Sequence, residues 1–155
     1  MKKLFFVFVS VMLICVSSAE ALQLPNKIND WILTSEFVTP LIPDANSEDL
    51  GRCIYKNYSR RKPIENLTVI LAQGKGFGNL IVPSEIPDEN SNTLMESQTG
   101  YEILEVAGHK AIFEKHEILP DVLAISVGNF ETLTLESNSL TQNEFIKIAE
   151  RILKK

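Results

Sequence analysis

The clearest periodic pattern in the chain lies at its C-terminal end. Apolar residues recur there at spacings of three and four, the period of one face of an α-helix; they are Phe145, Ile148, Ala149, Ile152 and Leu153. Thr141 and Glu144 stand before them in the order of a capping box, in which each side chain satisfies a free amide of the first turn. Lys154 and Lys155 place positive charge at the negative end of the helix dipole. We therefore predict a C-terminal helix that packs on the rest of the domain.

Two segments ahead of this helix show the residue types and turns of β-hairpins. Each has two runs rich in apolar and β-branched residues around a glycine-containing pair, which is typical of a tight hairpin loop. The predicted hairpins are residues 101–107 with 110–117 about Gly108-His109, and residues 122–127 with 130–136 about Gly128-Asn129. In the first hairpin we expect Leu104 opposite Phe113, because that register pairs apolar side chains with each other.

The first half of the chain predicts two further strands. Residues 52–58 favour an extended strand, and the apolar run of residues 67–72 suits a strand that is buried on both faces. Residues 28–51 contain Pro40 and Pro43 and are expected to form an irregular segment that covers one edge of the core. The remaining expectations are a turn at residues 60–63, a mobile loop or hairpin at residues 74–78 and a short helix near Ser91–Glu96.

Together these elements predict an α+β domain with a mainly antiparallel sheet of hairpins, covered by the C-terminal amphipathic helix. The segment from Tyr101 to Lys155, with its two hairpins and the capped ending from Leu133 to Glu150, resembles the close of small exported domains of unknown function. Some of those domains share the α/β/α sandwich of PsbP-like proteins, so the resemblance implies a sandwich as the alternative arrangement. It covers about a third of the chain and implies a fold but no catalytic residue.

The N-terminal segment has the pattern of an export signal. Lys2 and Lys3 precede an almost wholly apolar run from Leu4 to Val16, and Ala19-Glu20-Ala21 supplies the small residues of a cleavage site. We expect residues 1–21 to be a signal peptide and residues 22–155 to be one globular domain, periplasmic or extracellular. No later apolar stretch is long enough for a membrane span. Acylation of Cys15 is the alternative, but Ile14 stands where lipoprotein signals have a small residue.

Composition and charge exclude several classes of protein. The chain is 45% hydrophobic and 23% charged, as in globular proteins rather than intrinsically disordered ones. Loss of residues 1–21 leaves 13 basic and 19 acidic residues, a balance that argues against nucleic acid as a partner. It also leaves Cys53 as the single cysteine, so an internal disulfide is excluded. We expect Cys53 to be buried and unpaired; a reactive thiol and an intermolecular disulfide are the alternatives.

Residues with catalytic or cofactor chemistry are few. His109 and His116 are the only histidines, whereas zinc needs three or four converging ligands, and the chain has no G-x-S-x-G motif. Gly74, Gly76 and Gly78 follow a predicted strand, but their spacing fits neither the dinucleotide-binding pattern nor the P-loop. We therefore expect no metal and no cofactor.

The strongest candidate for a binding site is a run of positive charge. Residues 52–62 contain no acid, and the candidate ligand-binding residues are Arg52, Lys56, Tyr58, Arg60, Arg61 and Lys62. Arginine side chains suit carboxylate and phosphate groups, so an anionic ligand is expected. The alternative is internal pairing with residues 84–105, which contain six acids and no base.

These observations leave three hypotheses for function. The first is a non-enzymatic exported accessory or binding domain that works through its sheet face or its basic segment. The second is an inhibitor or assembly factor that engages another exported protein, and the third is a small hydrolase dependent on His109 or His116. A convergent polar cluster in the folded chain would favour the hydrolase, and a bare sheet face with a large apolar patch would favour the inhibitor or assembly factor.

Processing is directly testable. We expect the exported protein to begin at Leu22, and intact-mass measurement decides the point. A mass that includes Met1–Ala21, or one that includes acyl chains on Cys15, contradicts the prediction.

Overall fold

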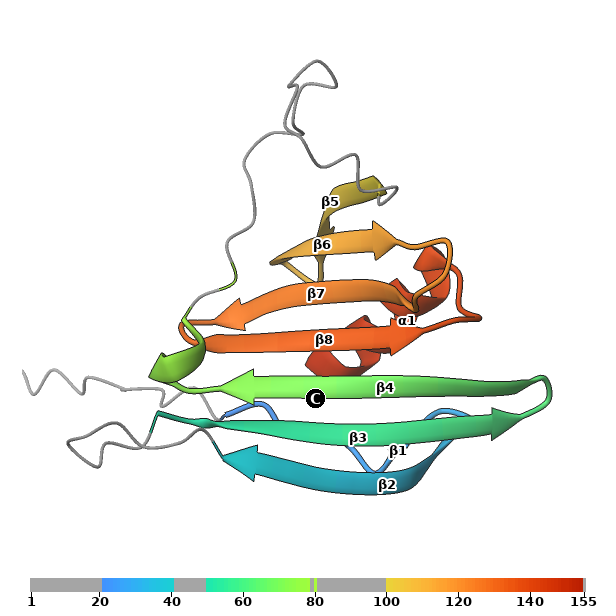
Figure 1. Ribbon diagram of the computed structural model, residues 1–155, viewed down its shortest axis with the longest axis horizontal. Helices are drawn as coiled ribbons and strands as arrows, with labels where there is room; N and C mark the ends of the chain where they lie inside the picture. Colours follow the sequence, from blue (N-terminus) through green and yellow to red (C-terminus); the bar gives the residue numbers. More distant parts are fainter. Residues whose placement is uncertain (1–20, 41–49, 79, 81–99, 155) are drawn as a thin grey trace, which may run out of the picture.

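The computed structural model describes residues 21–40, 50–78, 80 and 100–154. These residues form an eight-stranded sheet in the order β1-β2-β3-β4-β8-β7-β6-β5, with every neighbouring pair antiparallel (Figure 1). The strands are β1 (Lys27–Ile28), β2 (Trp31–Pro40), β3 (Arg52–Arg61), β4 (Ile64–Gln73), β5 (Gly100–Val106), β6 (His109–Lys115), β7 (Asp121–Gly128) and β8 (Glu131–Ser137). A short 3₁₀ helix, η1 (Lys75–Phe77), follows β4, and α1 (Gln142–Leu153) ends the described chain.

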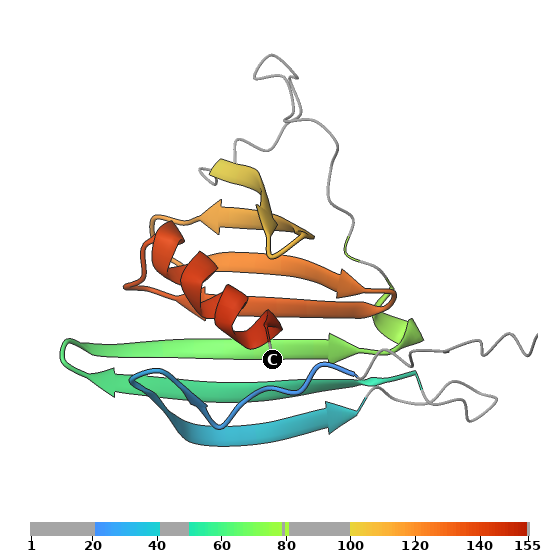
Figure 2. The ribbon, with the colours of Figure 1, turned by 180° about the vertical axis from the view of Figure 1, so that it is seen from behind.

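The helix α1 and the N-terminal segment lie on the same face of the sheet (Figure 2). Phe145, Ile148, Ala149 and Ile152 of α1 are buried, and the Phe145 ring lies 5.7 Å from that of Phe113 on β6. The predicted capping box is present at Thr141 and Glu144. The predicted class, a mainly antiparallel sheet covered by a C-terminal helix, is confirmed. The described residues give two layers, one helix on one sheet, rather than the three of an α/β/α sandwich.

The segment expected to be irregular is largely a strand. Within residues 28–51, β2 runs for ten residues and pairs with β3. β2 pairs with β1 only at its start, so most of it is an edge strand, and Ile32, Phe37 and Val38 are each about half exposed. An edge strand tolerates proline and needs no clean alternation of apolar and polar residues, which is why the sequence pattern missed it.

The strand expected to be buried on both faces is buried on one. In β4, Leu67, Val69 and Leu71 are buried beneath the helix, whereas the residues between them are only partly buried. The sequence pattern was misleading because Ile70 and Ala72, on the opposite and less buried face, are also apolar, so that the run has no alternation of apolar and polar residues.

Both hairpins form, with turns displaced from the predicted positions. The first turn is Ala107-Gly108, which places Leu104 opposite Ala111 rather than Phe113. Both turn residues have positive φ, 52° and 84°, as a tight turn between right-twisted strands requires. The second turn is Asn129-Phe130, and an irregularity between Ser126 and Gly128 shifts the pairing there.

In the glycine-rich segment after β4, residues 75–77 form η1, and the backbone at Gly74 closely approaches the start of β3. A Cβ atom on Gly74 would lie 2.3 Å from the Cα of Gly51, and both residues have positive φ. The N–H of Gly76 donates to the carbonyl of Leu50 at 2.8 Å. Gly51 and Gly74 therefore let the start of β3 and the end of β4 touch. The short helix expected near Ser91–Glu96 lies outside the described residues.

The packing of α1 predicts a large difference between two substitutions. Phe145 is fully buried, so Phe145→Ala should lower the free energy of unfolding by about 3–5 kcal/mol. Thr141→Ala removes part of the cap and should cost about 1 kcal/mol. Urea unfolding of both variants measures the difference, and a larger cost for Thr141→Ala would show that α1 does not pack as described.

Candidate functional site

The basic segment does not form one exposed patch. It runs along β3 and into the following turn, and strand alternation places Arg52, Lys56, Tyr58 and Arg60 on the helix-side face. Arg52, Lys56 and Tyr58 therefore share a face. That face, however, carries the N-terminal segment and α1, and Lys56 and Tyr58 are buried in it.

Lys56 and Tyr58 bind the chain's own N-terminal segment. The Lys56 ammonium donates to the carbonyl oxygen of Leu24 at 2.9 Å and to Oδ1 of Asn26 at 2.8 Å, and pairs with Glu36 at 3.3 Å. The Tyr58 hydroxyl donates to the carbonyl oxygen of Pro25 at 2.5 Å. Burial, assisted by the charge of Glu36, raises the pKa of Tyr58, so this hydroxyl stays protonated as a donor.

Arg60 connects three parts of the fold. Its guanidinium pairs with Glu65 of β4, with Glu144 of α1 at 3.2 Å and with Asp30 at 3.8 Å. It also lies over the ring of Trp31, 4.9 Å from the centroid, as in a cation–π contact. The hydrogen bond to Glu65 is the main cause that raises the pKa of Arg60. These contacts give Arg60 a structural role.

The other three basic residues are exposed, and Arg52 lies at the opposite end of β3 from Arg61 and Lys62. Arg52 begins β3 and its guanidinium approaches Oε1 of Gln73 at 3.4 and 3.5 Å, whereas Arg61 ends β3 and Lys62 follows it in the turn. A ten-residue strand separates its ends by roughly 30 Å, so these charges do not converge on one small anion. Of the acids in residues 84–105, the structure describes Glu102 and Glu105, and neither pairs with Lys56 or Arg60; Glu102 accepts a hydrogen bond from Gln142.

The two histidines lie apart as well. His109 begins β6 opposite Val106 rather than lying in the turn, and His116 follows the end of β6. The Nε2 atom of His116 lies 3.5 Å from Glu114, and its backbone N–H donates to Asp121. Across the described ranges, no three His, Cys, Asp or Glu side chains are grouped as a metal site would require.

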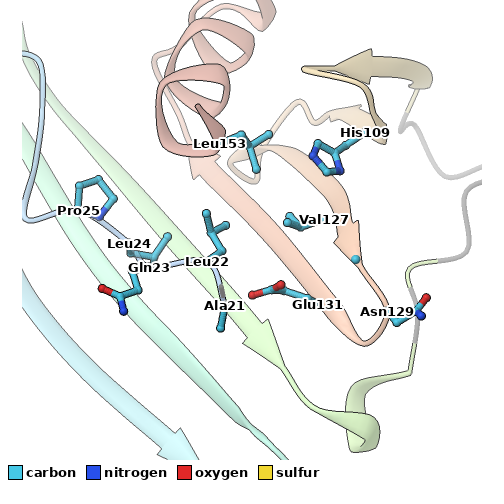
Figure 3. Close-up of a pocket in the computed structure, with 11 residues that line it drawn as sticks. Ala21, Leu22, Gln23, Leu24, Pro25, His109, Val127, Asn129, Glu131 and Leu153 are labelled. Atoms are coloured by element: carbon cyan, nitrogen blue, oxygen red, sulfur yellow. The ribbon is translucent and has the colours of Figure 1, made fainter. Parts of the chain in front are cut away.

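An open hollow of about 880 Å³ lies between the N-terminal segment, the β7–β8 turn and the end of α1 (Figure 3). The Gln73 amide there donates to the carbonyl oxygen of Leu22 at 3.3 Å and to the carboxylate of Glu131 at 2.5 Å. His109 also lines the hollow, but the structure records no hydrogen bond or ion pair from its ring to Glu131. The hollow is thus where the N-terminal segment meets the sheet.

The opposite face of the sheet carries no helix in the described part of the chain (Figure 1). The strand registers align seven residues into a line across this face. Each residue comes from a different strand, in the order β2, β3, β4, β8, β7, β6 and β5. This cross-sheet row consists of Phe37, Tyr55, Ile70, Thr134, Ala124, Ile112 and Ile103. Six of the seven are apolar or aromatic, and the Phe37 and Tyr55 rings stack at 4.5 Å.

Two flanking rows border the cross-sheet row and are mostly polar. The first flanking row is Ser35, Asn57, Thr68, Glu136, Val122, Glu114 and Tyr101. The second is Thr39, Cys53, Ala72, Thr132, Ser126, Lys110 and Glu105. In the first row, the Asn57 amide donates to Ser35 and its carbonyl accepts from Thr68, which fixes these side chains on the face.

Cys53 is unpaired, as predicted, but only partly buried. It lies on the uncovered face, in the second flanking row, where partial burial raises the pKa of its thiol against the opposing effect of a hydrogen bond with Tyr55. The prediction of a buried cysteine was wrong because its strand has a helix on one face only.

Comparison with known proteins gives no family: no family model, no curated protein and no solved structure matches this chain. None of the helices in the described residues has the length and apolar character needed to cross a membrane.

The contacts of Arg60 predict that replacing it lowers the stability of the domain more than replacing its neighbour Arg61. Arg60→Ala leaves three carboxylates without their partner and should lower the free energy of unfolding by about 1–3 kcal/mol. Arg61→Ala is the matched control, because Arg61 is exposed, and it should change stability by less than about 0.5 kcal/mol. Equal effects in urea unfolding would contradict the structural role of Arg60.

The contacts of Glu144 predict that the stability of the domain falls at acid pH. Hydrogen bonds from the backbone and hydroxyl of Thr141, with a smaller effect of Arg60, lower the pKa of Glu144. Its contribution to stability is therefore complete above the unfolded-state pKa of about 4.3 and is lost as pH falls through the lower folded-state pKa. Glu144→Gln should flatten the loss of stability with acid, and an unchanged pH profile would contradict this assignment.

Proposed function

We propose that this chain is an exported, non-enzymatic binding domain that engages another protein through the uncovered face of its sheet. The cross-sheet row carries the proposal. It is a line of apolar and aromatic residues with Thr134 at its middle, bordered by mostly polar rows, which is the arrangement of an interface with an apolar centre and a polar rim. Phe37 is half exposed and the other six residues are partly exposed, so the row keeps apolar surface in contact with solvent. A contiguous apolar surface of this kind is more typical of a binding site than of a solvated sheet face.

The backbone supports this use of the face. Five of the row's residues belong to strands that are paired on both sides. The other two lie on edge strands: Ile103 on β5, which pairs with β6, and Phe37 on β2, which is held by stacking on Tyr55. A partner would therefore meet a preformed surface, with little ordering of the chain to oppose binding. Neither the basic segment nor the histidines bring comparable groups together, so an anionic ligand and hydrolysis have less support.

Cys53 provides a reporter for the proposal. In intact producing cells treated with a membrane-impermeant maleimide, we expect Cys53 to react slowly because a partner covers the face. In the purified chain at low concentration it should react several-fold faster. Ile70→Lys, in the centre of the face, should make Cys53 react fast in both settings, whereas Ile118→Lys, at an exposed loop position, should leave it protected in cells.

A cysteine at a second position distinguishes two reasons for slow labelling of Cys53 in cells: cover by a partner and retention of the chain inside the cell. Lys147 lies exposed on α1, away from the face, so Lys147→Cys combined with Cys53→Ser should be labelled in intact cells. If it is not labelled, the chain is not exported and the proposal is wrong. If it is labelled and Cys53 reacts as fast in cells as in the dilute purified chain, the face is bare and the proposal is also wrong.

A further inference from the structure

We infer that the partner on the uncovered face is a second copy of this chain, packed face to face about a two-fold axis that runs along the cross-sheet row. The inference rests on the proposed function and names its partner. Homo-oligomers are most often two-fold dimers, in which one surface meets itself. A self-complementary face must therefore place apolar on apolar side chains and opposite charges on each other.

A two-fold axis can place the cross-sheet row of one copy on the same row of the other copy in two ways, by running along the strands or along the row. β8 is the middle one of the seven strands that the row crosses. An axis along the strands would place each flanking row opposite the same row of the partner, so that Glu136 of β8 would meet the partner's Glu136. An axis along the row exchanges the two flanking rows, and Glu136 then meets the partner's Thr132, which can donate a hydrogen bond. Repulsion of like charges therefore disfavours the first arrangement.

The axis along the row also pairs opposite charges. Lys110 and Glu114 occupy equivalent places in the two flanking rows of β6, so Lys110 meets the partner's Glu114, twice by symmetry. On β5, Tyr101 meets the partner's Glu105, a hydroxyl opposite a carboxylate. No position on the face is placed opposite a like charge.

These charged groups are available for such contacts. Lys110 is exposed, and among the described residues the structure records no ion pair for it. The side chain of Glu114 is 47% exposed, and the one ion pair recorded for it in the described part of the chain is with His116, at 3.5 Å. Stacked sheets lie about 10 Å apart and are rotated by about 30°, a separation that a lysine and a glutamate side chain together can bridge.

The size of the face fits a dimer. Seven strands at about 4.8 Å spacing and three rows along each strand give a surface of roughly 700 Å² on each copy. Stable complexes bury about 800 Å² on each partner. The face is thus large enough to hold two copies together without a further contact.

Charge reversal tests the arrangement in the purified chain beginning at Leu22. Sedimentation equilibrium should show a monomer–dimer equilibrium. Lys110→Glu and Glu114→Lys should each weaken dimerisation at least tenfold, and the double variant should restore it, because each pair is then formed with its charges exchanged. Lys147→Glu, on the helix, is the matched control and should leave dimerisation unchanged. Thermal unfolding verifies that each variant folds.

Cys53 adds an independent measurement, because it lies in the interface opposite the partner's Asn57. Its rate of modification should fall as the concentration of the wild-type chain rises, and should stay high at all concentrations in Lys110→Glu. Recovery of slow modification in the double variant supports the two-fold arrangement even if one single variant folds poorly.

Different failures distinguish the two proposals. A purified chain that stays monomeric, with Cys53 still protected in cells, overturns the dimer and leaves another protein as the partner. A dimer that is insensitive to both charge reversals, or that tightens on Glu136→Gln, overturns the axis along the row. Cys53 that reacts equally fast in cells and in the dilute purified chain overturns the proposed function and the dimer together.

Discussion

The ion pairs of Arg60 connect the parts of this domain that the sequence keeps far apart. One guanidinium contacts β4 through Glu65, the first turn of α1 through Glu144 and the N-terminal segment through Asp30. Because the guanidinium of arginine stays charged, the pH dependence of these contacts is set by the protonation of the three carboxylates. Glu144 also accepts from the backbone N–H of Thr141 at 3.0 Å. The start of the helix and its position on the sheet are thus fixed by the same carboxylate.

A second constraint acts four residues before Arg60 on the same strand, β3. A buried ammonium is costly unless its donors are satisfied, and Lys56 is satisfied by Leu24, Asn26 and Glu36. Without the segment from Leu22 to Asn26, Lys56 would lack most of these partners and Tyr58 would lose its acceptor. The N-terminal segment is therefore part of the core of the domain, although it contributes only two residues to the sheet.

The features that the sequence predicted are those determined locally. The cap at Thr141 and Glu144 and the apolar stripe after it lie within one helix, so their spacing alone identifies α1. The hairpin registers needed the backbone dihedral angles of the turn residues, and residue types do not distinguish Gly108-His109 from Ala107-Gly108. The basic segment was visible as charge, but the groups that neutralise Lys56 and Arg60 come from other parts of the chain. The cross-sheet row combines single residues from seven strands and becomes visible only when their order and register are known.

The order of the strands divides the sheet into two contiguous halves. β1 to β4 pair only among themselves and with β8, and β5 to β8 pair only among themselves and with β4. The join is the set of pairs from Thr68↔Glu136 to Gln73↔Glu131, reinforced across it by Arg60 and Glu144. All other strand pairing is local in sequence and can form early, so the docking of β4 on β8 is the long-range step of folding. A chain cut between η1 and β5 would keep every other strand pair within one fragment, which makes this domain suited to reassembly from two separately produced pieces.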